Sequence, residues 1–223
     1  MIDYEIRTKE DLCRAVEDCG FLPLFQNEIS GFSVEEHVAP QAWFTDEEGV
    51  WEWKGPVIRE TGCAYGKFFG KKAVFVSRKC FPDFANYRRD GYDFDARFED
   101  ELVSYRDKRL YDLIEASAPV LSKELKQAGD YRKGGNKGFE TIITHLQEQC
   151  YVLISDFKYM RDKHGDTYGW GVAEYSTPEV WFGPEFRSTV YQRTPEESYE
   201  RVRKHLARLL PDASDVQIRK LLK

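Results

Sequence analysis

The sequence predicts an α+β fold with a helical C-terminal tail. The prediction depends on three observations: helical periodicity of apolar residues, short β-type segments joined by a turn, and a composition that can form a core. Hydrophobic residues make up 41% and aromatic residues 15% of the 223 residues, so enough apolar surface is present to bury. This length suits one compact domain or two small ones.

Residues 1–104 are predicted to form an N-terminal α+β region. Thr8 and Asp11 have the spacing of a helix-capping box, although Asp replaces the usual Glu. A helix is therefore expected directly after Thr8. Charges of both signs become dense after residue 93, and we place a weak boundary there, near Ser104.

Two segments of this region have β-type patterns. In VWEWK, residues 50–54, tryptophans alternate with charged side chains, which is the pattern of a half-buried strand. The stretch CAYGKFFGKKAVFVS, residues 63–77, predicts two strands joined by a turn at Gly70-Lys71. We therefore expect a small sheet in the N-terminal region.

Residues 105–180 are predicted to form a winged-helix domain. A helix over about 106–116 precedes a second helix capped by Ser122 and a third helix with a strong apolar stripe. The stripe consists of Phe139, Ile142, Ile143, Leu146 and Cys150. YVLISDF and YGWGVAEY then predict two strands around a loop at His164-Gly165. Three helices followed by strand, loop and strand is the order of a winged helix-turn-helix, a DNA-binding arrangement.

Residues 181–223 are predicted to form a helical extension. Thr194 is expected to cap a helix, with Pro195 at its first position and Glu197 completing a capping box. Pro211 ends this helix, and a last short helix begins at Asp212 or Ser214.

The loop before the third helix is basic, although the formal net charge of the chain is −6. That net charge argues against a protein whose whole surface attracts nucleic acid. Any binding of nucleic acid would therefore need a local basic patch. Arg132, Lys133 and Lys137 lie in this loop, and cations beside glycines can contact phosphates. We expect these three residues to contact DNA, assisted by the wing. The wing candidates are Arg161, Lys163 and His164. A merely solvated loop is the alternative.

The outer face of the third helix is expected to carry Thr141, Thr144, His145 and Glu148. Thr can contact bases, but this face has no Arg to grip guanine. We therefore expect Thr141, Thr144 and His145 to contribute weakly to DNA binding, and the loop and wing to contact the backbone.

The sequence shows no sign of a cofactor, a metal or a membrane span. The five cysteines lack the close spacing of a zinc knuckle, and no phosphate-binding glycine motif occurs. No apolar run approaches the roughly 20 residues that span a bilayer. The N-terminal residues lack the apolar core of a signal peptide. We expect a cytoplasmic protein with no cofactor, whose oligomeric state the sequence does not indicate.

Several runs, among them CAYGKFF, FPDFANYRRDGYDF, KGFETIITHLQ and YGWGVAEY, resemble the AlkZ-related family, distant relatives of the AlkZ-type winged-helix DNA glycosylases. The resemblance implies a DNA-binding winged-helix protein. If it is an enzyme, the expected reaction is cleavage of the N-glycosidic bond of alkylated bases in DNA repair. The glycosylases carry a Gln-x-Gln or Gln-x-Asp pair, for which Gln26-Asn27-Glu28 is the candidate match. Glu28 would be the general base or stabilise an oxocarbenium-like sugar, and Gln26 would orient water.

Two other functions fit the sequence. One is a non-catalytic interaction or regulatory module, favoured by the acidic net charge and by the absence of Arg from the outer helix face. The other is a small-molecule enzyme with its site among Trp51, Trp53 and the acids at 46–48.

Overall fold

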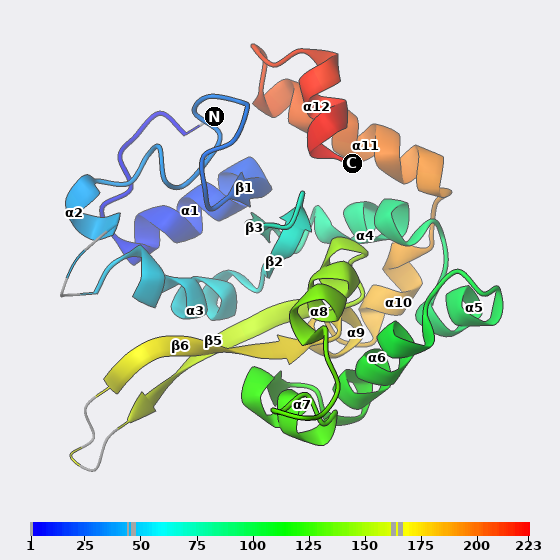
Figure 1. Ribbon diagram of the computed structural model, residues 1–223. Helices are drawn as coiled ribbons and strands as arrows, with labels where there is room; N and C mark the ends of the chain where they lie inside the picture. Colours follow the sequence, from blue (N-terminus) through cyan, green and yellow to red (C-terminus); the bar gives the residue numbers. More distant parts are fainter. Residues whose placement is uncertain (1, 44, 46–47, 162–163, 165–166) are drawn as a thin grey trace.

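Figure 1 shows the computed structural model, which describes residues 2–43, 45, 48–161, 164 and 167–223. Within these residues, helices surround one antiparallel sheet of six strands in the order β1-β3-β2-β5-β6-β4. The strands are β1 (Phe21–Pro23), β2 (Ala64–Phe69), β3 (Lys72–Val76), β4 (Val120–Leu121), β5 (Leu153–Arg161) and β6 (Thr167–Ser176). The α+β prediction is confirmed to this extent: the described residues form a mixed fold of helices and one antiparallel sheet.

Helices precede, separate and follow these strands, and the last four helices come after the last strand. Those of the first half are α1 (Lys9–Cys19), α2 (Pro40–Trp43), α3 (Val50–Thr61), α4 (Phe81–Arg89) and α5 (Phe94–Glu99). Those of the second half are α6 (Tyr105–Ser117), α7 (Ser122–Ala128), α8 (Phe139–Glu148), α9 (Pro178–Trp181), α10 (Glu185–Val190), α11 (Pro195–Leu209) and α12 (Asp215–Leu221). No helix of the described residues is both long and apolar enough to cross a membrane.

The sheet joins the two halves of the chain. The β2–β3 hairpin turns at Gly70 and Lys71, which both have positive φ as a tight turn requires. The long β5–β6 hairpin pairs with it where Tyr65 of β2 lies opposite Ile154 of β5. The sheet therefore includes strands from both sides of residue 104. The division into units at 104 and 180 stays a prediction.

Helix ends follow the local rules of capping. The Thr8 hydroxyl accepts a hydrogen bond from the Asp11 amide at 3.2 Å, and the Asp11 carboxylate accepts one from the Thr8 amide at 3.2 Å. Thr194 and Glu197 make the same reciprocal pair at the start of α11. Ser122, in contrast, is the first residue of α7 rather than its cap, and Leu121 holds the cap position.

The expected strand at VWEWK is wrong, because these residues begin helix α3. Residues two apart on a helix point to nearly opposite sides, and here both sides are covered. Trp53 is buried in the core that α3 shares with α1 and β5. Trp51 packs on the other side, where its indole nitrogen donates to the Trp43 carbonyl at 3.0 Å. Because tryptophans are packed on both faces of the helix, the sequence alternates between aromatic and charged residues, as it would in a half-buried strand.

Candidate nucleic-acid interface

The loop between α7 and α8 has a defined shape, held by its own backbone. The Asn136 amide donates to the Asp130 carbonyl at 2.6 Å, and the Asn136 side chain donates to the Gly129 carbonyl at 2.8 Å. Gly135 approaches Asp130 so closely that a Cβ would lie 2.2 Å from its carbonyl oxygen. A residue with a side chain would therefore not fit at position 135 without moving the loop.

Three cations of this loop are exposed and available. The side chains of Arg132, Lys133 and Lys137 form no hydrogen bond or ion pair within the described residues. Their neighbour Lys126, by contrast, is engaged by Glu140 at 2.7 Å. Cations without carboxylate partners are the groups that exchange counterions for phosphates.

Helix α6 adds two arginines beside the loop, which sequence reasoning missed. Burial raises the pKa of Tyr131 in the loop, and the nearby Arg109 and Arg106 guanidinium groups oppose that shift. Both arginines are exposed, and no ion pair involves them in the part of the chain that the structure describes. We call the set Arg106, Arg109, Arg132, Lys133 and Lys137 the basic surface. No local pattern in the sequence indicates which face of α6 meets the loop.

The outer face of α8 differs from the expectation. Thr144 was expected to face outward, but it is buried, at 7% exposure, and the Lys67 ammonium donates to its hydroxyl at 3.3 Å. Gln147 is buried as well, and its side-chain oxygen accepts from the Lys67 amide at 3.1 Å. The physical reason is that β2 packs across this side of α8. Thr141 is exposed, as expected.

His145 is half-buried and binds within the protein. Its Nδ1 lies 3.1 Å from the Asp107 carboxylate on α6. Thr141, Thr144 and His145 line a cavity of about 430 Å³, together with two lysines and three acids. The other lining side chains are Lys67, Lys71, Asp107, Glu140 and Glu148, with Ile142 among them. This mixture of charges gives the cavity no strong preference for an anion.

The ion pair of His145 makes stability dependent on pH. The hydrogen bond that the His145 ring donates to the Asp107 carboxylate raises the pKa of His145 above its ordinary 6.5, although burial opposes the shift. A raised pKa in the folded state stabilises the protein fully below about pH 6.5, and this contribution is lost as pH rises through the folded-state pKa. We expect urea-denaturation midpoints to fall across that window, and to fall less in His145→Gln. An unchanged pH dependence in the variant would contradict the assignment.

The wing candidates are described only in part. Arg161 is the last residue of β5, but its side chain lies outside the described set, as does all of Lys163. His164 is exposed and takes part in an interaction of its own.

Gln26 and Glu28 are exposed residues of the loop after β1. The Gln26 amide donates to the Glu35 carboxylate at 2.7 Å, and Glu28 forms an ion pair with Lys220 of α12. The Glu28 side chain is 65% exposed. Figure 1 draws this loop near α12, far across the molecule from the α7–α8 loop. The structure therefore does not bring Gln26 and Glu28 next to the basic surface.

The aromatic region around Trp51 packs into the protein. Trp51 contacts the rings of Phe25, Trp43 and Trp170. The Lys54 ammonium lies 4.5 Å from the ring centroid of Trp51, and burial lowers the pKa of Lys54 to about 8. Of the acids at 46–48 that were considered with these tryptophans, residues 46 and 47 lie outside the described residues. Across the described residues, no three His, Cys, Asp or Glu side chains are grouped so that they could hold a metal ion.

Comparison with known proteins gives one finding. A family model described as AlkZ related matches residues 6–223. Neither the curated proteins nor the solved structures give a match. Since the matched segment covers nearly the whole length, the chain belongs to the AlkZ-related family.

Proposed function

We propose that this protein binds DNA through the sugar–phosphate backbone and that the basic surface makes the contacts. The observation that carries the proposal is that the α7–α8 loop holds three exposed cations and that two exposed arginines of α6 act on Tyr131 of the same loop, while none of the five has a carboxylate partner within the described residues. In a chain of net charge −6, such a local surface is the part that can attract phosphates. The AlkZ-related family adds support, because the AlkZ-type proteins to which its description refers are DNA glycosylases.

We further propose that residues 105–180 form a winged helix-turn-helix. The support is the order α6, β4, α7, α8, β5 and β6, together with the pairing of both β4 and β5 with β6. A short strand after the first helix that joins the wing hairpin fits this arrangement. In this proposal α8 takes the position of the recognition helix.

The proposed contact differs from that of an ordinary recognition helix. Strand β2 covers Thr144 and Gln147, so this side of α8 cannot enter a major groove. Backbone contact through the loop needs no base reading and is compatible with this burial. We do not propose cleavage of the N-glycosidic bond, because Gln26 and Glu28 lie away from the basic surface.

The triple variant Arg132→Gln/Lys133→Gln/Lys137→Gln tests the proposal. We expect the wild-type protein to raise the fluorescence anisotropy of a labelled duplex at low salt. Each phosphate contact contributes about 0.9 to the slope of log affinity against log salt, so the variant should reduce the slope by about 3. A matched control, Arg219→Gln/Lys220→Gln/Lys223→Gln, removes three exposed cations from the C-terminal end and should keep the slope.

Two outcomes would contradict the proposal. One is no anisotropy change at micromolar protein and low salt, with undamaged duplex and with duplex that contains an abasic-site analogue. The other is binding that does not weaken as salt rises, which would favour the interaction module, since phosphate contacts impose a steep salt dependence.

A further inference from the structure

An exposed tryptophan lies on the long β5–β6 hairpin, which projects from the body of the protein in Figure 1. Trp170 of β6 is 77% exposed, whereas tryptophan normally buries most of its large apolar ring. It does not belong to the basic surface. The residues around the ring indicate what kind of partner would cover it.

An irregularity of the hairpin sets the position of this tryptophan. The two strands lose their regular register between Lys158 and Met160, where Tyr159 of β5 alone lies opposite residues 169–171 of β6. Extra residues of this kind bend a strand and redirect its side chains. Trp170 is the middle residue of the bulged segment, so the bulge decides which way its side chain points.

Glycines on both sides of Trp170 make the bulge possible and leave space beside the indole. Gly169 has a φ of +71°, a conformation that favours glycine, and no atom lies within 4 Å of where its Cβ would be. A Cβ at Gly171 would lie 3.0 Å from the Tyr159 ring. A flat group can therefore approach the indole without meeting a side chain of either neighbouring residue.

The indole of Trp170 rests against Trp51, which is itself fixed in place. The two ring centroids are 6.0 Å apart, and the ring planes are at 77°. Trp51 Nε1 donates to the Trp43 carbonyl at 3.0 Å, and the Tyr159 hydroxyl donates to the Trp51 carbonyl at 3.0 Å. Trp51 also contacts the Phe25 ring. Trp170 thus has firm support on one side, while most of its surface is in solvent.

A positive charge lies next to these rings. The Lys54 ammonium is 4.5 Å from the Trp51 ring centroid and 4.3 Å from that of Phe157. Burial lowers the pKa of Lys54 to about 8, so the group is still mostly protonated at pH 7. Lys54 forms no ion pair among the described residues, and the nearby Glu52 carboxylate accepts from the Gly49 amide at 3.1 Å. The charge repels a cationic partner and attracts an anionic one.

We propose that Trp51, Lys54, Tyr159 and Trp170, which we call the aromatic surface, bind an unpaired base of nucleic acid. The base stacks on the Trp170 indole, and Lys54 attracts the phosphate next to it. Every base has a π-face, so such stacking needs no particular sequence. Bases inside a duplex are already stacked, so this surface selects single strands. The choice of nucleic acid as the partner rests on the proposed function.

Trp170→Ala tests the aromatic surface. It should weaken the binding of a short labelled oligothymidine at least about fivefold, because it removes the stacking of one base. Trp170→Phe keeps a smaller ring and should lose less. Affinity for a fully paired duplex should stay within about twofold of wild type in both variants. Since the ring is mostly in solvent, the urea midpoint of Trp170→Ala should match that of wild type and show that it folds.

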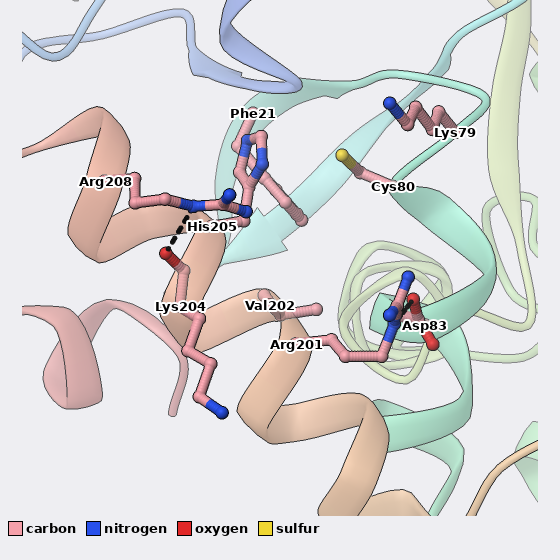
Figure 2. Close-up of a pocket in the computed structure, with 9 residues that line it drawn as sticks. All are labelled: Phe21, Lys79, Cys80, Asp83, Arg201, Val202, Lys204, His205 and Arg208. Atoms are coloured by element: carbon pink, nitrogen blue, oxygen red, sulfur yellow. Dashed lines mark hydrogen bonds and ion pairs between the residues drawn. The ribbon is translucent and has the colours of Figure 1, made fainter.

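A pair of lysine variants tests the role of the charge. Lys54→Gln should weaken the binding of oligothymidine and reduce its dependence on salt, because a phosphate contact is lost. Lys204→Gln is the matched control. It removes an exposed cation of α11, whose ammonium points away from the other labelled side chains in Figure 2. Its affinity for oligothymidine should stay within about twofold of wild type, and an equal loss in both lysine variants would contradict the role of Lys54.

The outcomes separate this inference from the proposed function. Equal affinity of wild type and Trp170→Ala for oligothymidine, with duplex binding intact, would overturn the aromatic surface and leave the proposed function standing. Binding of oligothymidine that requires Trp170, without any binding of duplex, would support the aromatic surface and overturn the proposed function. Tryptophan emission that shifts to shorter wavelength as protein concentration rises without DNA, in wild type but not in Trp170→Ala, would show that a second copy covers the ring. That result would also overturn the inference.

Discussion

Arg89→Met is expected to destabilise the protein by about 3–5 kcal/mol, because it breaks a buried ion pair on one side only. Arg89 is 1% exposed. Its guanidinium donates to the Glu179 carboxylate at 2.7 Å, to the Tyr191 hydroxyl at 3.1 Å and to the Cys150 carbonyl at 2.9 Å. It thereby connects α4 with α9, with the residue that follows α10 and with the chain just after α8. Methionine would leave a carboxylate and a carbonyl buried without donors. The free energy of unfolding from urea titration measures the loss.

Two further variants separate the ion pair from simple packing. Arg89→Met/Glu179→Gln removes the orphaned charge, so it should lose less stability than the sum of the two single variants. Arg187→Met replaces an exposed arginine and should change stability by less than about 0.5 kcal/mol. A loss in Arg89→Met as small as that of Arg187→Met would show that the buried pair contributes little.

The elements that the sequence predicts best are those whose signals are local. The Thr8 and Thr194 caps act within three residues, so the capping boxes of α1 and α11 follow from spacing alone. The β2–β3 hairpin follows from its turn. Helix α3 could not be predicted in this way. Trp51 and Trp53 are buried by α1, β5 and Trp43, and the sequence of residues 50–54 does not show that these groups pack there. Tertiary burial thus decides where local pattern is ambiguous.

In the candidate interface too, features set by local sequence could be predicted, whereas features set by tertiary packing could not. Composition indicates the loop cations, because they lie in one short segment. It does not indicate Arg106 and Arg109, whose position beside Tyr131 depends on how α6 packs. Nor does it indicate the burial of Thr144, which lies on the polar side of α8 by periodicity but under β2 in the fold. The periodicity of a helix separates its apolar face from its polar face, but it does not show whether the polar face is exposed to solvent.

Ile143→Ala is expected to destabilise the protein by about 2–5 kcal/mol, because it leaves a cavity in a fully buried site. Ile143 lies in the middle of α8, which packs against α6 on one side and β2 on another. The helix is therefore enclosed by both halves of the chain, and truncation there removes contacts that neither half can replace by relaxing alone. Urea denaturation measures the change.

Thr141→Ala, on the exposed side of the same helix, is the matched control. It should change stability by less than about 0.5 kcal/mol. Its effect on DNA affinity is informative as well, since a base-reading helix would lose about 1–3 kcal/mol with a lost base contact. We expect affinity within about twofold of wild type, because backbone contacts are assigned to the basic surface. A large loss of affinity with unchanged stability would instead place α8 in a groove. That result would require β2 to move away from Thr144 and Gln147 on binding, because both are covered in the structure.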